Sequence, residues 1–433
     1  MLVRGLIAVG VVLGLAVVRA GAGEAPGLTE QEAVRLALQH QPMVQAAQAE
    51  AAMAGARAGM ARSEERLQLS LNALAAASDM VSAVQVPAVM PQAIMMSQDR
   101  TAVDLNAMAM LPLATGGRLR ENVRAADQGA QAAAWRSAGT RVQVAYEARA
   151  RFADWRSALA MAKVAADALA AQQRATDLAR ERFNVGKIPQ FDLLRNEAAL
   201  AAAKQQVTNA AADVAAARAR LAQALGVPAG TLPKVAAESP VGGLLVIGSS
   251  LAMAWAQRPD LLAANAEVAA AAAALRAKED AYRPQLYAFG MGDVASPPAM
   301  GSSTTGVVGI IVGVPLVNGG RRSAELAEAC AAVERAKAMR ATVELQVEAD
   351  VTEAQARLAA ASQNLETAAA QVKSAEASYT VAQERYSAGK STVVELLDAA
   401  RARTEAEQSL VVAEAQRGLR LADLVRAMGM EWP

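Results

Sequence analysis

Three carboxylates near the ends of long helical segments are the residues best placed for electrostatic chemistry in this chain. Glu395 and Asp398 are three residues apart, so in a helix their side chains lie on one face. Asp192 stands 203 residues before Glu395, in a segment that the later one repeats. Carboxylates grouped in this way attract cations and repel one another. A simpler alternative is that they are ordinary first-turn acids, which the helix dipole favours.

Residues for nucleophilic or metal chemistry are scarce. His40 is the only histidine and Cys330 the only cysteine among 433 residues. The position of His40 at a helical break favours a turn or capping role. A single thiol makes neither a disulfide within the chain nor a cysteine-based metal site, and we expect Cys330 to be a small buried residue. The chain also lacks a Gly-x-Ser-x-Gly motif and a phosphate-binding loop, so we expect no enzyme activity, no cofactor and no metal site.

Methionines form another group with ligand chemistry. Thioether sulfur binds the soft ions Cu(I) and Ag(I), so metal efflux is one interpretation of a methionine-rich segment. The other interpretation is that flexible methionines fill an irregular loop. The segment contains Met80, Met90, Met95, Met96, Met108 and Met110.

The composition favours long helices and excludes a nucleic-acid partner. Only 3% of the residues are aromatic, and Ala, Gln, Glu and Arg are abundant. Lys and Arg together number 43 against 42 for Asp and Glu, which leaves a net charge of +1. The two signs are interleaved along the helical segments, as on solvated helix faces.

The first 22 residues have the pattern of an export signal. Arg4 supplies the positive end, residues 6–18 are apolar, and Ala20-Gly21-Ala22 matches a cleavage site. The apolar run is shorter than the roughly 20 residues that a membrane-spanning helix needs. No later segment is predicted to cross a membrane as a helix. An exported chain of this kind either stays in the periplasm or crosses the outer membrane as strands.

A repeat organises the rest of the chain. Residues 182–187 return as 385–390, and each copy ends a long helical pattern, turns at Gly-Lys and starts another helix. No proline interrupts residues 118–183, which predicts a continuous helix of about 100 Å. The chain is therefore expected to contain one folded-back unit, made twice.

Alternating apolar and polar residues predict two pairs of strands. Residues 67–73 and 103–109 alternate with a period of two, and a loop separates them. In the second pair Val308, Ile310, Val312 and Val314 alternate with Gly309 and Gly313, on a strand that could face lipid. Such segments of about ten residues are typical of outer-membrane strands.

These patterns predict the division of the chain. Each repeat consists of a helix, a strand pair, a long helix, a tip turn and a return helix. The expected parts are a signal peptide, 1–22; a first repeat, 23–226, with strand pair 65–113 and tip turn 184–190; an equatorial connector, 227–250; a second repeat, 251–429, with strand pair 284–317 and tip turn 387–393; and a C-terminal tail, 430–433.

The order of these features resembles the TolC-type outer-membrane efflux proteins (outer membrane factors). Both strand pairs end in Pro-Leu-x-x-Gly-Gly-Arg, at 112–118 and 315–321, and lead into the long helices. The resemblance covers essentially the whole mature chain. It implies a mainly α fold with a small β part, in which a homotrimer forms a 12-stranded outer-membrane β-barrel continuous with a long periplasmic α-helical barrel.

The resemblance also implies roles for particular residues. Acidic rings and tyrosine contacts constrict the periplasmic end of the family's tunnel, and the matching residues here are Glu395, Asp398, their counterpart Asp192, and Tyr386. Ser391 stands where a well-known member of the family has a latch arginine, so the latch differs. The tip turns would meet a periplasmic adaptor, although a purely structural turn is the alternative. The residues expected to make this contact are Gly186, Lys187, Gly389 and Lys390.

The sequence thus predicts a passive exit duct in the cell outer membrane, with a large periplasmic part. Its expected partners are two further copies of the chain, outer-membrane lipid, a periplasmic adaptor (membrane fusion protein) and the inner-membrane pump of a tripartite efflux or type I secretion system. The alternative is a periplasmic helical-hairpin adaptor without a pore, against which the period-two segments argue.

Overall fold

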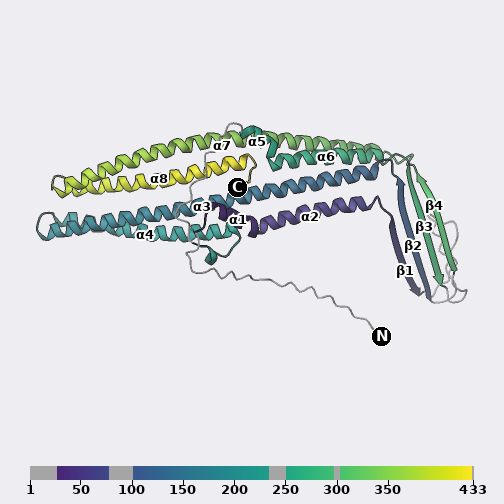
Figure 1. Ribbon diagram of the computed structural model, residues 1–433, viewed down its shortest axis with the longest axis horizontal. Coiled ribbons are helices and arrows are strands. Elements are labelled where there is room, and N and C mark those ends of the chain that lie inside the picture. The colour runs from purple at the N-terminus through teal and green to yellow at the C-terminus, as the bar shows by residue number, and fades with distance from the viewer. Residues whose placement is uncertain (1–26, 78–100, 234–249, 297–302, 432–433) are drawn as a thin grey trace.

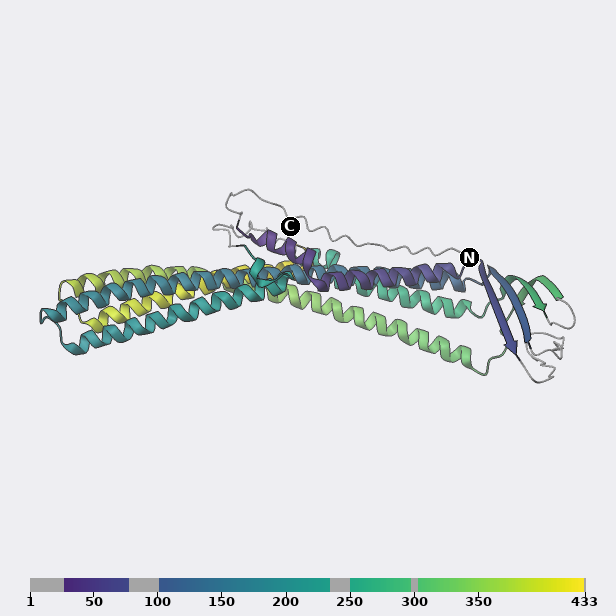
Figure 2. The same ribbon diagram turned by 90° about the horizontal axis from the view of Figure 1, so that it is seen from below.

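The structure is a computed structural model of a single chain, and it describes residues 27–77, 101–233, 250–296 and 303–431. The expected signal peptide, four of the six methionines (Met80, Met90, Met95 and Met96) and most of the expected connector lie outside these residues. A small sheet lies at one end of an elongated molecule, and paired helices run away from it to two turns at the opposite end (Figures 1 and 2).

The fold is mainly helical with one small antiparallel sheet, as expected. Across the described ranges, no helix is long and apolar enough to cross a membrane. The helices are α1 (Glu30–His40), α2 (Pro42–Ser63), α3 (Arg118–Asn184), α4 (Gln190–Leu225), the 3-10 helix η1 (Ala229–Thr231), α5 (Ser250–Gln257), α6 (Pro259–Asp280), α7 (Arg321–Ser387) and α8 (Val393–Ala427). The strands are β1 (Gln68–Ala77), β2 (Thr101–Ala114), β3 (Gln285–Ser296) and β4 (Ser303–Gly313).

The four strands form one antiparallel sheet in the order β1-β2-β3-β4, so β1 and β4 are its edges. The register gives the sheet two unlike faces. On one face Leu71 and Val308 are 67% and 89% exposed, respectively. On the other face Asn72, Asn106 and Asp293 stand side by side across three strands. The sheet therefore presents one apolar face and one face, called the polar face below, on which polar side chains stand among apolar ones.

A joint near the middle of the body holds the first repeat together. Pro42 at the first position of α2 prevents one continuous helix, and the chain bends at Gln41. The Gln41 side-chain amide donates to the carbonyls of Gln223 and Ala224, at 3.2 and 3.0 Å, in the last turn of α4. Gly226 ends α4 with φ +69°, and a Cβ there would lie 2.7 Å from the backbone oxygen of His40. His40 is the last residue of α1, directly before this break.

The second repeat contains the same joint with different side chains. Arg258 precedes Pro259 at the start of α6 and donates to the carbonyl of Ala427 at 3.4 Å. Gly429 has φ +75°, and a Cβ there would lie 2.6 Å from the Cα of Arg258. Both breaks therefore lie against the end of a return helix, while α3 and α7 continue past them (Figure 1).

Small side chains dominate the packing between helices. In the first repeat Phe152 and Trp155 of α3 are 1% and 4% exposed and pack against Leu221 and Leu225 of α4. Most of the other buried positions are alanines, which allow helix axes to approach closely. A second cluster lies where α7 meets α8 and α5, around Val351.

The expectation that Cys330 is buried was wrong. Its side chain is exposed in the single chain. It lies in the first half of α7, which packs against α6 on one side and stands apart from the other helices (Figure 2). Sequence composition could not show this, because burial here depends on which side of α7 has a neighbour.

Gly226→Ala is expected to lower the thermal unfolding temperature more than Gly186→Ala. Both glycines have positive φ, +69° and +72°, so each alanine carries a backbone penalty of about 1–2 kcal/mol. Only at Gly226 would the new Cβ also overlap a backbone oxygen, that of His40. Circular dichroism melting of the purified protein measures the difference, and equal shifts would contradict the close packing of the joint.

Candidate functional site

The two helix-to-helix turns lie together at the end of the molecule farthest from the sheet (Figure 1). Each has the same hydrogen bonds: the amide of Lys187 donates to the carbonyl of Arg182 at 2.8 Å, and that of Lys390 to Arg385 at 2.9 Å. Gly186 and Gly389 both have φ +72°, the left-handed conformation that ends helices in this type of cap. These four glycine and lysine positions are all exposed.

The two tips differ in what they bury. At the second tip Tyr386 is 4% exposed and packs with Val393 and Leu396. At the first tip Val185 and Phe191 are 66% and 67% exposed. The repeat therefore makes one turn twice, but only the second turn covers its apolar side chains within the chain.

Arg182 joins the two tips. Its Nη1 donates to the carbonyl of Tyr386 at 2.9 Å and its Nη2 to that of Ser387 at 2.8 Å. The guanidinium carbon also lies 4.7 Å from the centroid of the Tyr386 ring, a cation–π contact. The last carbonyls of a helix have no partner within it and carry the negative end of its dipole, so an arginine stabilises them.

In the sequence Arg182 only marks the repeat, and its contact with the second tip was not predicted. A basic residue in the last turn of each long helix was the available signal, since such residues often bind terminal carbonyls. The sequence does not show that the carbonyls belong to the other hairpin, 204 and 205 residues away.

Glu395 lies in the first turn of α8 and is exposed. Its amide donates to the hydroxyl of Thr392, the N-cap residue, at 3.4 Å. Its Oε2 accepts a hydrogen bond from the Ser391 hydroxyl at 2.6 Å. These are the contacts of a first-turn acid, and they leave the carboxylate open to solvent. Ser391 holds Glu395 in place within its own turn.

Asp398 and Asp192 lie on different hairpins. Asp398 is exposed one turn after Glu395 and borders a groove of about 480 Å³ between the hairpins, together with Arg195 of α4. Asp192 is half-buried in the first turn of α4, where its carbonyl accepts a hydrogen bond from the Asn196 side chain at 2.9 Å. Within one chain, the structure thus places Glu395 and Asp398 on one helix and Asp192 on its counterpart.

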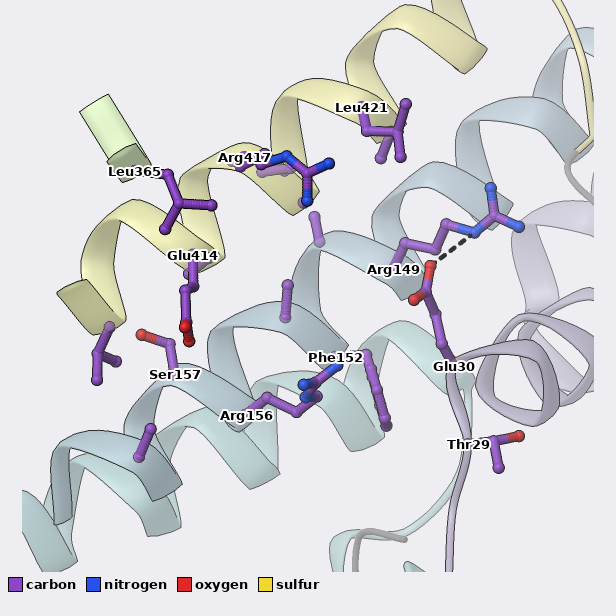
Figure 3. A pocket seen from close by; sticks show the side chains of 18 of the residues that line it. Thr29, Glu30, Arg149, Phe152, Arg156, Ser157, Leu365, Glu414, Arg417 and Leu421 are labelled. Atoms are coloured by element: carbon purple, nitrogen blue, oxygen red, sulfur yellow. Dashed lines mark ion pairs between the residues drawn. The ribbon is translucent and has the colours of Figure 1, made fainter. Parts of the chain in front are cut away.

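A larger pocket of about 650 Å³ lies in the helical body, between α1, α3, α7 and α8 (Figure 3). Its charged lining mixes signs, with Arg149, Arg156 and Arg417 against Glu30 and Glu414. Arg149 is 6% exposed and forms an ion pair with Glu30 at 3.3 Å. Burial lowers the pKa of the Arg149 guanidinium, while the charge of Glu30 opposes that shift. Residues of both repeats line the pocket, and its printed ion pair, between α1 and α3, lies within the first repeat.

Within the described part of the chain, no group of three or more His, Cys, Asp and Glu residues could hold a metal ion.

Comparison with known proteins supports the assignment of the whole chain. The model of the outer membrane efflux protein family matches residues 33–227 and 251–430. A curated relative, the outer membrane efflux protein BepC of Brucella suis, is 28% identical over 329 residues, which is 72% of this chain and 68% of the relative.

Solved structures share the fold. The outer membrane protein VceC of Vibrio cholerae has a TM-score of 0.77 at 19% identity, over 92% of this chain and 96% of VceC. The MtrE outer membrane channel of Neisseria gonorrhoeae has a TM-score of 0.75 at 20% identity, over 92% of this chain and 88% of MtrE.

Arg182→Ala is expected to loosen the second tip. Hydrogen bonds from a charged donor contribute about 1.5–3 kcal/mol, and the partial exposure of Arg182 reduces this value. Amide hydrogen exchange at residues 388–390 is therefore expected to accelerate on the order of tenfold, or about 1.4 kcal/mol.

Arg180→Ala is the matched control for this experiment. Arg180 lies two residues earlier and pairs with Glu197 of its own hairpin at 3.0 Å. The control should leave exchange at the second tip unchanged. Equal effects of the two variants would show that Arg182 does not hold the hairpins together.

Proposed function

The chain belongs to the outer membrane efflux protein family, and we propose that three copies of it form a passive exit duct through the outer membrane. Family membership places the chain in the outer membrane as part of an efflux system. The proposal concerns how the duct is built, where it closes and what it contacts.

The sheet is the observation that carries the proposal. Its edge strands β1 and β4 have no partner strand among the described residues, and one of its faces is apolar. A strand edge cannot face lipid, because the unpaired backbone groups would find no water there. Four strands are also fewer than the eight of the smallest outer-membrane barrels. Three copies supply 3 × 4 = 12 strands and close the sheet.

The helical body supports the same assembly. α2, α3, α6 and α7 lie in a row, with α2 and α7 at its outer sides. Both outer helices expose apolar side chains, such as Met60 at 61% on α2 and Leu345 at 69% on α7. In a closed ring, α2 of one copy would cover α7 of the next. α3 and α7 contain 67 residues each, which gives a tunnel of about 100 Å below the membrane.

The proposed division of the chain follows this assembly. A signal peptide, 1–22, would be removed, and the repeats 23–226 and 251–429 would each supply two strands and a helical hairpin. The connector 227–250 and the tail 430–433 would lie at the equator, beside the joints. We assign the exposed apolar face of the sheet to outer-membrane lipid.

The proposed constriction lies at the tips. Glu395 and Asp398 from three copies would bring 3 × 2 = 6 carboxylates to one end of the tunnel, with Asp192 nearby on the other hairpin. Their repulsion would favour opening, and their charge would favour cations. Tyr386 would belong to the closed constriction, where Arg182 contacts its ring and its carbonyl. This assignment goes beyond the local contacts of Glu395, which a first-turn acid would also make.

The proposed partners meet the same end. The exposed turns at Gly186-Lys187 and Gly389-Lys390 would contact the helical hairpins of a periplasmic adaptor. An inner-membrane pump would supply the energy, and we assign no catalytic role to the duct itself.

Planar-bilayer recording of the purified protein tests the proposed function. A detergent-solubilised trimer with stepwise conductance is the expected result. A well-folded trimer without conductance, or a monomer that is soluble without detergent, would refute the duct.

Glu395→Gln with Asp398→Gln is expected to reduce cation selectivity. The double variant removes six charges from the proposed constriction while keeping the side chains polar, so the reversal potential in a salt gradient should move toward zero. Glu366→Gln with Glu376→Gln, two exposed positions along α7, is the matched control and should leave selectivity unchanged. If both double variants behave like the wild type, the two acids are only first-turn residues.

A further inference from the structure

Methionines meet on the polar face of the sheet. Met108 of β2 stands directly opposite Met291 of β3, and Met110 lies two residues along β2 on the same face. Met108 is 38% exposed, and Met110 and Met291 are half-buried. In the sequence Met108 and Met110 belong to a group with four loop methionines, whereas the register brings Met108 opposite Met291, 183 residues away in sequence.

The neighbouring cross-strand pairs of β2 and β3 surround these three methionines. Phe289 is opposite Met110, and a Cβ on Gly309 of β4 would lie 2.7 Å from the Phe289 ring. The ring therefore leans over Gly309, away from Met110. On the other side of Met291, Asp293 stands opposite Asn106. The thioethers thus lie between an aromatic ring and a carboxylate.

We infer that Met108, Met291 and Met110 form a binding site for a soft monovalent cation, Ag(I) or Cu(I), on its way through the duct. The inference rests on the proposed function, because it takes the polar face of the sheet as the lining of the pore. It names a class of cargo for that pore.

The geometry suits two or three thioether ligands. Residues directly opposite each other in an antiparallel pair have Cβ atoms about 4.5–5.5 Å apart. Methionine has three rotatable side-chain bonds, so the sulfur atoms of Met108 and Met291 can turn toward one ion between them. Thioether sulfur prefers soft metals, whereas carboxylate oxygen prefers hard ones. Asp293 would therefore attract cations electrostatically, and the thioethers would select among them.

Isothermal titration of the purified, detergent-solubilised trimer with Ag(I) in chloride-free buffer tests the site. We expect Met108→Leu with Met291→Leu to lose one equivalent of Ag(I) per chain, or to bind it at least about tenfold more weakly. Replacing a metal ligand should lower the affinity for Ag(I) at least as much as replacing a residue that hydrogen-bonds to a ligand, which lowers metal affinity about 10–100-fold. Leucine keeps a similar volume, so the trimer and its conductance should persist.

Met43→Leu with Met53→Leu is the matched control, because these methionines are 59% and 54% exposed on α2 and are not part of the sheet. The control should titrate like the wild type. Unchanged Ag(I) binding by the Met108/Met291 variant would overturn the inference, as would an equal loss in both variants.

The outcomes separate this inference from the proposed function. Conductance without Ag(I) binding would remove the metal site and leave the duct. Ag(I) binding that depends on Met108 and Met291 in a trimer without conductance would refute the duct and keep the binding site. Ag(I) that blocks the current of the wild type, but not that of the variant, would support both.

Discussion

The hydrogen-bonding needs of the backbone inside lipid are the constraint on which the rest of this structure depends. A four-stranded sheet satisfies its inner strands and leaves the outer sides of β1 and β4 open. Within a bilayer those groups must be paired by another strand. In the proposed trimer, association would therefore be part of folding, and each feature of the tunnel would be shared by several chains. Below the membrane, the exposed apolar side chains of α2 and α7 would likewise be covered by a neighbouring copy.

The duplication of the chain gives its two helical hairpins the same turns, and small departures from the repeat make the two tips different. The two tip turns have the same hydrogen bonds and the same left-handed glycine. Yet Phe183, the counterpart of Tyr386 203 residues earlier, is 37% exposed, whereas Tyr386 is 4% exposed. Arg182 then spans from the first tip to the carbonyls of the second. The first hairpin thus donates hydrogen bonds to the end of α7 in the second hairpin, and the two hairpins have different roles at this contact.

Local pattern was enough to predict most of the fold. Alternation gave the strands, an uninterrupted run without proline gave α3, and the Gly-Lys pairs gave the turns, because each depends on neighbours in sequence. The order of these elements gave the family. Contacts between distant segments could not be predicted: Arg182 meets Tyr386 only where the two hairpins pack, and Met108 meets Met291 only where β2 pairs with β3. Arg149 and Glu30 likewise meet only where α1 packs against α3. The error at Cys330 has the same origin, since its exposure depends on the neighbours of α7. The roles of Glu395, Asp398 and Asp192 stay predictions, because they concern groups brought together by other copies.

The joints in the helical body have a mechanical consequence. In each repeat a short helix, a break and the end of a return helix coincide at one level, while α3 and α7 run through that level without interruption. At this level each break thus lies beside a continuous helix, α3 in the first repeat and α7 in the second. In the described part of the chain, no level of the helical body has a break in all of its helices. A displacement of the tips must therefore be spread along the rods as gentle bending and twist, which long helices accommodate over many turns. The short helices end at the breaks, and α3 and α7 would bend when the tips move.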